Sequence, residues 1–238
     1  MFDFFNQVVI VTGGSGNLGG ATVRAFHAAG ATLVVPDRRA GRVQTLFPQL
    51  VEDGGHYLAG DTDVTRPEDV TRLVDATLER LGRIDVLVNT VGGYRAGDPP
   101  HETSLETWDF MLNLNARSAF ITSRAVVPAM LERGRGKIVN TAARSALVSR
   151  ARECAYSASK SAVARLTESL AAAYKADGLN VNAILPGTID TPQNRAAMPQ
   201  AKHSRWVKPE AIAQVILFLA SDAAGPINGA LIPVYGLS

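Results

Sequence analysis

Apolar runs of six to eight residues alternate along the chain with longer stretches in which apolar positions recur at helical spacing. The runs predict strands at residues 7–13, 31–37, 56–61, 84–90, 137–142, 180–185 and 229–236. The stretches between them predict helices at residues 18–30, 67–82, 105–131, 155–176 and 209–221. Continuous apolar runs are typical of strands that are buried on both faces of a parallel sheet. The pattern therefore predicts a doubly wound α/β fold with right-handed crossovers.

The length and composition narrow the class of protein. The chain has 238 residues, about right for one α/β domain, and no linker, repeat or low-complexity stretch divides it. We expect a single domain over residues 1–238. The net charge is only +2, and no dense run of lysine and arginine is present. These features predict a small-molecule partner rather than a nucleic acid.

Cysteine, histidine and the N-terminus exclude further classes. The single cysteine, Cys154, permits no intrachain disulfide and no metal site built on cysteines. The histidines His27, His56, His101 and His203 show no metal-ligand spacing, so we expect no metal. The N-terminus lacks a basic region and a cleavage site, and no apolar run reaches about 18 residues. We expect a cytoplasmic protein without a membrane segment.

The stretch VVIVTGGSGNLGGA joins the first predicted strand to the first predicted helix. Gly13, Gly16 and Gly19 leave out side chains there, so the backbone can approach a pyrophosphate at the helix N-terminus. The sequence therefore predicts a dinucleotide-binding turn that consists of Gly13, Ser15, Gly16, Asn17, Leu18 and Gly19.

The end of the second predicted strand bears on the choice of cofactor. Asp37 lies 18 residues after Gly19, where a carboxylate can accept hydrogen bonds from ribose hydroxyls and would repel a 2′-phosphate. Arg38 and Arg39 follow directly and could hold such a phosphate. The residues favour NAD and leave NADP possible.

Tyr156 and Lys160 form the strongest candidate for chemistry. They lie four residues apart in a predicted helix, on one face and one turn apart. A free phenol titrates near pH 10, too high for a useful acid or base at neutral pH. A nearby lysine cation favours the phenolate, and the lysine can also hold the ribose of a nicotinamide nucleotide. The pair predicts acid/base catalysis beside a bound dinucleotide.

Several motifs together resemble the short-chain dehydrogenases/reductases. They are TGGSGNLG (12–19), DV (63–64), NTVG (89–92), Asn115, YSASK (156–160) and LPGTIDT (185–191), in the order and spacing of that family. The resemblance covers essentially the whole chain. It implies a Rossmann fold with a seven-stranded parallel sheet, hydride transfer with a nicotinamide cofactor, and a homodimer or homotetramer.

The resemblance also implies roles for individual residues. Asn115 would hold a water in a proton relay to Lys160. The adenine and its ribose would be bound by Asp63, Val64, Asn89 and Gly92, and the nicotinamide would face Pro186, Gly187 and Ile189. Asn17 stands where the family has a glycine, and asparagine tolerates left-handed backbone better than most residues.

The main departure is a missing serine. The family's serine, which donates a hydrogen bond to the substrate carbonyl, belongs three residues after Asn140, and this chain has Ala143 there. Loss of such a donor would cost a carbonyl reductase on the order of 10²-fold in rate. Ser145 and Thr141, each two residues away, are the nearest hydroxyls.

A narrower resemblance offers an explanation for the alanine. AARSAL (142–147), VGG (91–93) and the segment 185–206 resemble quinonoid dihydropteridine reductase, whose branch also lacks the serine. We expect residues of about 188–208 to form a loop over the substrate, with contacts from Asn194 and Trp206.

Three hypotheses follow. The chain is a short-chain reductase that acts on a quinonoid dihydropterin, or one that acts on a small carbonyl or alcohol. The alternative is a dinucleotide-binding protein with weak or no catalysis, which would act as a sensor or partner subunit.

Overall fold

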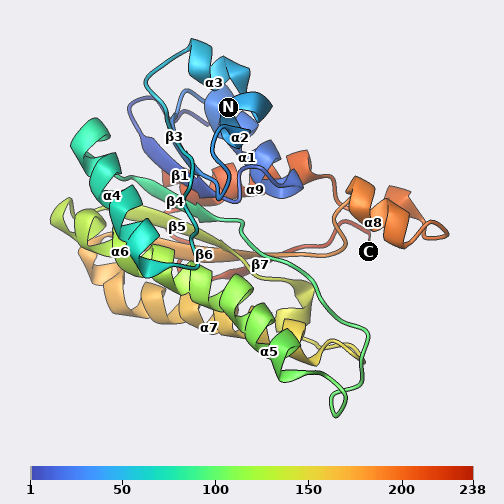
Figure 1. The fold of residues 1–238 in the computed structure, drawn as a ribbon. Helices are drawn as coiled ribbons and strands as arrows, with labels where there is room; N and C mark the ends of the chain where they lie inside the picture. The colour runs from blue at the N-terminus through green and yellow to red at the C-terminus, as the bar shows by residue number, and fades with distance from the viewer. Residues whose placement is uncertain (1, 238) are drawn as a thin grey trace.

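A seven-stranded parallel sheet runs through the centre of the computed structural model, which describes residues 2–237, and its strand order is β3-β2-β1-β4-β5-β6-β7 (Figure 1). The strands are β1 (Val8–Thr12), β2 (Thr32–Pro36), β3 (Tyr57–Ala59), β4 (Val86–Asn89), β5 (Gly136–Thr141), β6 (Leu179–Pro186) and β7 (Leu231–Val234). The reversal of strand order beside β1 is the feature of a doubly wound sheet. The expected Rossmann fold with seven parallel strands is confirmed.

Helices cover both faces of the sheet. They are α1 (Asn17–Ala28), α2 (Arg42–Leu46), α3 (Pro48–Glu52), α4 (Pro67–Leu81), α5 (Leu105–Met111), α6 (Ser118–Glu132), α7 (Cys154–Tyr174), α8 (Pro192–Ala197) and α9 (Pro209–Ala220). Val9 and Val11 of β1 pack in the core cluster that contains residues of α1 and α9. Val8 and Ile10 belong to the cluster with α4, α6 and α7 (Figure 1). Because side chains alternate along a strand, the four apolar residues of β1 contribute to both cores.

Some elements differ from the sequence expectation. The helix expected at 105–131 is α5 and α6 joined by a π-helical segment, Leu112–Arg117. Helices α2, α3 and α8 were not expected, because five or six residues are too few to show a helical period. The third strand is only three residues long, since it lies at the edge of the sheet and pairs with β2 alone.

Buried amide side chains connect the middle of the sheet to two helices. Asn89 and Asn140 are partners in the register of β4 and β5, and Asn89 Nδ2 donates to Asn140 Oδ1 over 2.9 Å. Asn140 Nδ2 donates to Thr167 of α7 over 3.0 Å, and Thr122 of α6 donates to Asn89 Oδ1 over 2.8 Å. This amide chain fixes the height of α7 against the sheet.

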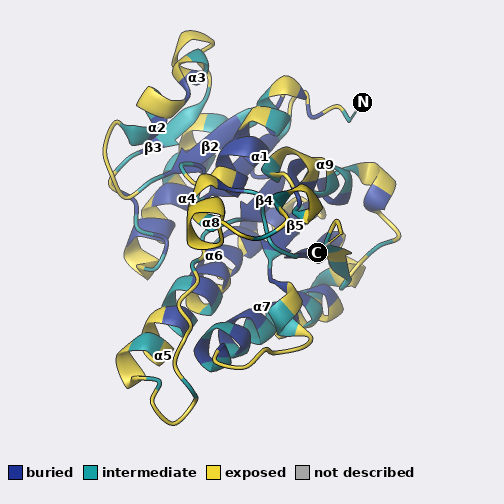
Figure 2. Cartoon of the chain, turned by 90° about the vertical axis from the view of Figure 1, so that its right-hand side faces the viewer, coloured by how far each residue is buried: buried dark blue, intermediate teal, exposed yellow. Residues whose placement is uncertain are grey.

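The carboxyl ends of the strands form one edge of the molecule. The segments after β4, β5 and β6 all leave the sheet there, on the right of Figure 1. Figure 2 looks onto this edge and shows the exposed helix α8 in front of buried strands. Ligands of open α/β sheets bind at this edge. Among the described helices, none has both the length and the apolar character needed to cross a membrane.

We predict that Asn140→Ala lowers the free energy of unfolding by about 2–3 kcal/mol, because it leaves a donor of Asn89 without its partner in the interior. Chemical denaturation measures the change. Asn113→Ala, at a partly exposed position, is the control and should change stability by less than about 0.5 kcal/mol. Equal losses in the two variants would contradict the role of the amide chain.

Candidate active site

Tyr156 and Lys160 lie on the first turns of α7, on the side that faces the end of β5. Lys160 is buried, and its Nζ donates to the main-chain oxygen of Thr141 over 2.8 Å. Burial lowers the pKa of Lys160 to about 8. Burial also raises the pKa of Tyr156, and the nearby Glu153 carboxylate and Tyr94 raise it further. Without other charges, both groups are pushed toward their neutral forms.

Asn115 lies in the π-helical segment and is buried. Its Oδ1 accepts from the main-chain N–H of Gly93 over 2.9 Å, and its Nδ2 donates to Ser159 Oγ over 2.9 Å. A Cβ at Gly92 would lie 2.9 Å from Asn115 Oδ1 and 3.2 Å from Lys160 Nζ. The structure therefore brings Gly92, Asn115 and Lys160 together, although Gly92 and Lys160 are 68 positions apart in the sequence. A π-helical turn is frequent at functional sites.

The position of the missing serine is buried. Ala143 follows the end of β5 in extended backbone, with 7% of its surface exposed. The hydroxyl of Ser145 donates to Glu153 Oε2 over 2.8 Å. Thr141 Oγ1 is buried without a hydrogen-bond partner among the described residues. No hydrogen bond or contact places the hydroxyl of Ser145 or Thr141 at the position of the Ala143 side chain.

Sequence reasoning missed Glu153. It stands directly before α7, three residues ahead of Tyr156, and only 8% of it is exposed. Its carboxylate accepts from the hydroxyls of Ser145 and Tyr94 (3.1 Å). The Tyr94 ring meets the Tyr156 ring edge-on, with centroids 4.8 Å apart. The only signal in the sequence was an acidic residue beside the YSASK motif.

The glycine-rich turn is as tight as the sequence predicts. A Cβ at Gly19 would lie 2.0 Å from the oxygen of Gly13, and Gly13 itself has φ of +71°. Gly16 stands just before α1, so free main-chain N–H groups point out of the turn. Because Gly13, Gly16 and Gly19 have no side chains, nothing from these residues covers the N–H groups. This cradle fits a pyrophosphate.

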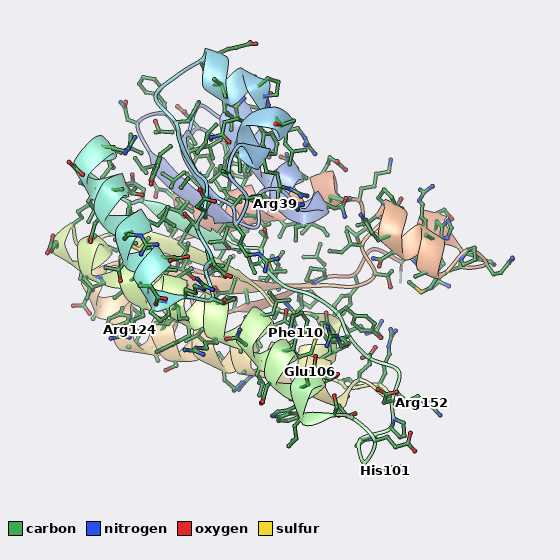
Figure 3. The ribbon with its side chains drawn as sticks, viewed as in Figure 1. Arg39, His101, Glu106, Phe110, Arg124 and Arg152 are labelled. Carbon is green, nitrogen blue, oxygen red and sulfur yellow. The ribbon has the colours of Figure 1, made fainter. Side chains whose placement is uncertain are left out.

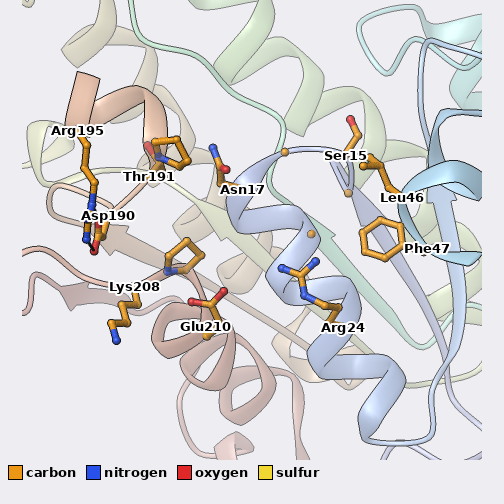
Figure 4. A pocket seen from close by; sticks show the side chains of 15 residues that line it. Ser15, Asn17, Arg24, Leu46, Phe47, Asp190, Thr191, Arg195, Lys208 and Glu210 are labelled. Carbon is orange, nitrogen blue, oxygen red and sulfur yellow. Dashed lines mark hydrogen bonds and ion pairs between the residues drawn. The ribbon is translucent and has the colours of Figure 1, made fainter. Parts of the chain in front are cut away.

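A pocket of about 590 Å³ opens beside the turn (Figure 4). Ser15, Asn17 and Arg24 lie on one side of it, and Asp190 and Arg195 lie on the other. Asn17 Nδ2 donates to Gln193 Oε1 of α8 over 2.8 Å across the gap. The asparagine that replaces the family glycine thus connects the turn to the segment expected to cover the substrate.

Asp37 directly follows β2, and the next two residues, Arg38 and Arg39, are exposed. Figure 3 labels Arg39. Asp37 Oδ1 accepts from the main-chain N–H of Arg39 over 2.8 Å, and Arg42 Nε lies 3.9 Å from Oδ2. The side chain is held in place with acceptor capacity left.

The other residues expected at the cofactor differ in which of their polar groups already have hydrogen-bond partners within the protein. The Asn89 side chain is committed to the amide chain, so only its main chain can face a ligand. Asp63 Oδ1 accepts from the main chain and hydroxyl of Thr65, and Val64 is buried. At the end of β6, the N–H of Gly187 donates to Val234. The remaining two residues are Pro186, which ends β6, and Ile189, which pairs with Val207.

Two residues expected at the substrate have partners within their own segment. Asn194 Nδ2 donates to the main-chain oxygen of Ile189 over 2.8 Å. The Trp206 ring packs against His203 with centroids 4.5 Å apart. The segment of about 188–208 is therefore folded, with α8 at its centre.

Two of the four histidines lie together away from this edge. His27 Nε2 lies 2.6 Å from Asp53 Oδ2, and His56 completes a group with the geometry to hold an ion. However, His56 Nδ1 accepts from the main-chain N–H of Leu33. The neutral ring then carries its proton on Nε2 and has no lone pair left for a metal. The absence of a metal site stays a prediction.

The depressed pKa of Lys160 gives a testable pH dependence. Between pH 8 and pH 10 the unfolded chain binds more protons at this site than the folded chain, so stability rises with pH there. We predict a gain on the order of 2 kcal/mol that Lys160→Met lacks. Denaturation curves at several pH values measure it, with the exposed Lys175→Met as control. Parallel pH curves for wild type and Lys160→Met would contradict the prediction.

Known proteins with the same sequence features are enzymes. A family model described as short chain dehydrogenase matches residues 7–202. The D-threitol dehydrogenase of Mycolicibacterium smegmatis is 36% identical, covering 99% of this chain and 94% of its own. The meso-2,3-butanediol dehydrogenase of Serratia marcescens is 34% identical, covering 98% and 94%. The crystal structure of gox2181 superimposes with a TM-score of 0.92 at 31% identity, over 98% and 96%. The chain therefore belongs to the short-chain dehydrogenases/reductases, a family of NAD(P)-dependent oxidoreductases.

Proposed function

We propose that this chain transfers hydride between a nicotinamide dinucleotide, preferably NAD, and a small alcohol or its ketone. The observation that carries the proposal is the convergence of Tyr156, Lys160 and Asn115 at the edge that also bears the glycine-rich turn. A binding protein without chemistry would have no use for a buried lysine one helical turn from a partly buried tyrosine, because burial of the cation is costly.

The three side chains have separate roles in this proposal. Tyr156 exchanges a proton with the substrate oxygen. Lys160, held by the Thr141 carbonyl, favours the phenolate and binds the ribose of the cofactor. Asn115 positions the backbone at Gly93 and anchors a water that leads to Lys160. The dinucleotide, when bound, supplies or accepts the hydride.

The cofactor would lie along the carboxyl edge. The main-chain N–H groups of the turn at Gly13–Gly19 would hold the pyrophosphate, and Asp37 would accept hydrogen bonds from the adenosine ribose. The acceptor capacity left on Asp37 supports NAD over NADP. The adenosine and nicotinamide contacts that we propose are those of Asp63, Val64, Asn89, Gly92, Pro186, Gly187 and Ile189.

The replacement of the family's serine by Ala143 affects which class of substrate we expect. The relatives named above act on a polyol and a diol according to their names, which supports an alcohol. The buried Ala143 favours a second candidate, a quinonoid dihydropterin, because hydride transfer to a conjugated ring needs no hydroxyl to steer a carbonyl oxygen. Ser145, Asn194 and Trp206 are the proposed substrate contacts in either case.

We also propose a cytoplasmic homodimer or homotetramer. The exposed apolar side chains of Trp108, Phe110 and Phe120 lie on α5 and α6, which both contact α7. Apolar surface of this kind supports contact with a second copy.

Steady-state kinetics test the proposed function. We predict oxidation of a secondary alcohol with NAD, and a loss of about 10²-fold or more in Tyr156→Phe, which keeps the ring but lacks the proton. Ala143→Ser should raise ketone reduction if the substrate is a carbonyl compound. Turnover of quinonoid dihydropterin with no response to Ala143→Ser would favour the pterin. Tight dinucleotide binding without turnover of either class would favour the noncatalytic alternative.

A second measurement tests the cofactor. Asp37→Ser removes the charge that would repel a 2′-phosphate, so we predict that the NAD-to-NADP ratio of kcat/KM falls roughly tenfold or more. Asp75→Ser, at an exposed position on α4, is the control and should leave the ratio unchanged. An unchanged ratio in Asp37→Ser would contradict the assignment to the ribose.

A further inference from the structure

Glu153 is a buried carboxylate at the edge where the reaction is proposed to occur. It is the residue just before α7 and lies three residues before Tyr156. The Tyr94 ring bridges them, because its hydroxyl bonds to Glu153 over 3.1 Å and its ring contacts the Tyr156 ring. A single side chain therefore contacts both the Glu153 carboxylate and the ring of the proposed acid/base.

The Glu153 carboxylate forms no ion pair with a described residue, although Arg150 acts electrostatically on its partner Tyr94. Among residues 2–237, no lysine or arginine nitrogen lies within the 4.0 Å of an ion pair with its carboxylate. Both donors that reach it, Ser145 and Tyr94, are neutral hydroxyls. A carboxylate has about four lone-pair positions, and buried charges are normally paired. Glu153 thus keeps acceptor capacity, although the N-terminus of α7 favours its negative charge.

One of the two donors can give way to a ligand. Tyr94 is 64% exposed and lies between β4 and α5, in a segment without helix or strand. The segment itself is held near the start of α7, because Gly97 N–H donates to the main-chain oxygen of Arg152 and the Arg152 side chain donates to the main-chain oxygen of Gly97. Figure 3 shows Arg152 at the outer end of the edge. A substrate hydroxyl can therefore replace the Tyr94 hydroxyl on a carboxylate that stays in place.

The polarity of the site is the reverse of what the missing serine would provide. Ala143 has no hydrogen-bond donor in its side chain. The hydroxyl of the nearest serine, Ser145, already donates its hydrogen bond to Glu153. The protein thus presents a strong acceptor beside Tyr156. Acceptors on the protein bind donors on the ligand, and a hydroxyl next to the reacting carbon is such a donor.

We infer that Glu153 is a specificity-determining residue whose carboxylate accepts a hydrogen bond from a second hydroxyl on the carbon next to the reacting carbon. The site then selects vicinal diols and α-hydroxy ketones over simple alcohols and ketones. This inference rests on the proposed function and assigns its substrate class. It also explains how a substrate is held without the serine, since the second hydroxyl supplies the fixed contact.

The test compares two alcohols that differ by one hydroxyl, meso-2,3-butanediol and 2-butanol, with NAD. We expect Glu153→Gln, which keeps the shape and loses the charge, to lower kcat/KM for the diol 10- to 100-fold, mainly through KM. The loss for 2-butanol should stay below about threefold. The exposed Glu79→Gln on α4 is the matched control and should change neither value.

Equal losses on both alcohols would overturn the inference, because a purely structural or electrostatic role acts on every substrate through Tyr156. A preference for 3-amino-2-butanol over the diol that Glu153→Gln abolishes would also overturn it, in favour of a cation site. Tyr94→Phe provides a second check. It frees one carboxylate oxygen without touching Glu153, so the preference for the diol should persist or increase.

A binding measurement separates this inference from the proposed function. Calorimetric titration of the NAD-saturated Tyr156→Phe protein with both alcohols measures binding with little or no turnover. Diol binding that is at least tenfold tighter than 2-butanol binding, and that is lost when Glu153→Gln is added to Tyr156→Phe, supports the role of Glu153, even if the wild type oxidises no alcohol and the proposed function fails. Equal affinities of Tyr156→Phe for the two alcohols would overturn the role of Glu153 and leave the oxidoreductase proposal standing.

Discussion

The amide chain from Asn89 through Asn140 to Thr167 is the constraint on which the site depends. Two amides in register across β4 and β5 can satisfy each other only if neither strand slips, because a one-residue shift would turn one of them to the opposite face. The bond to Thr167 then fixes α7 along its own axis. Tyr156 and Lys160 lie two to three turns ahead of Thr167 on the same helix, so their height above the sheet follows from this bond.

Burial shifts the pKa values of Lys160 and Tyr156 in opposite directions, but it favours the uncharged form of both groups. It lowers the pKa of Lys160 and raises that of Tyr156, so both groups are shifted toward their neutral forms. Glu153 strengthens the effect on the tyrosine. The protein therefore holds the phenolic proton until a positive charge arrives, a state suited to protonating an oxygen. The positively charged oxidised nicotinamide would shift the balance the other way.

The sequence was sufficient for the fold because burial on both faces of a parallel sheet leaves a plain mark, a run such as VVIVT without polar interruptions. For the candidate site it predicted one local pair, Tyr156 and Lys160, which the structure places on the first turns of α7. It could not show that the Asn89 side chain bonds to Asn140 in the interior. That bond depends on the register between β4 and β5, which cannot be read from the sequence of either strand alone. The environment of Glu153 was equally hidden, because its partner Tyr94 lies 59 residues away on an irregular segment.

The π-helical segment Leu112–Arg117 has a consequence for how this helix tolerates change. Each residue of an α-helix advances the chain by about 100° around the axis. A π-turn contains roughly one residue more than an α-turn, so α5 and α6 are out of phase by about that angle. Deleting one residue would restore the better hydrogen bonding of an α-helix and rotate Asn115 away from Gly93 and Ser159. In this segment the number of residues matters as well as their identity, because a deletion would displace Asn115 while it stabilises the helix.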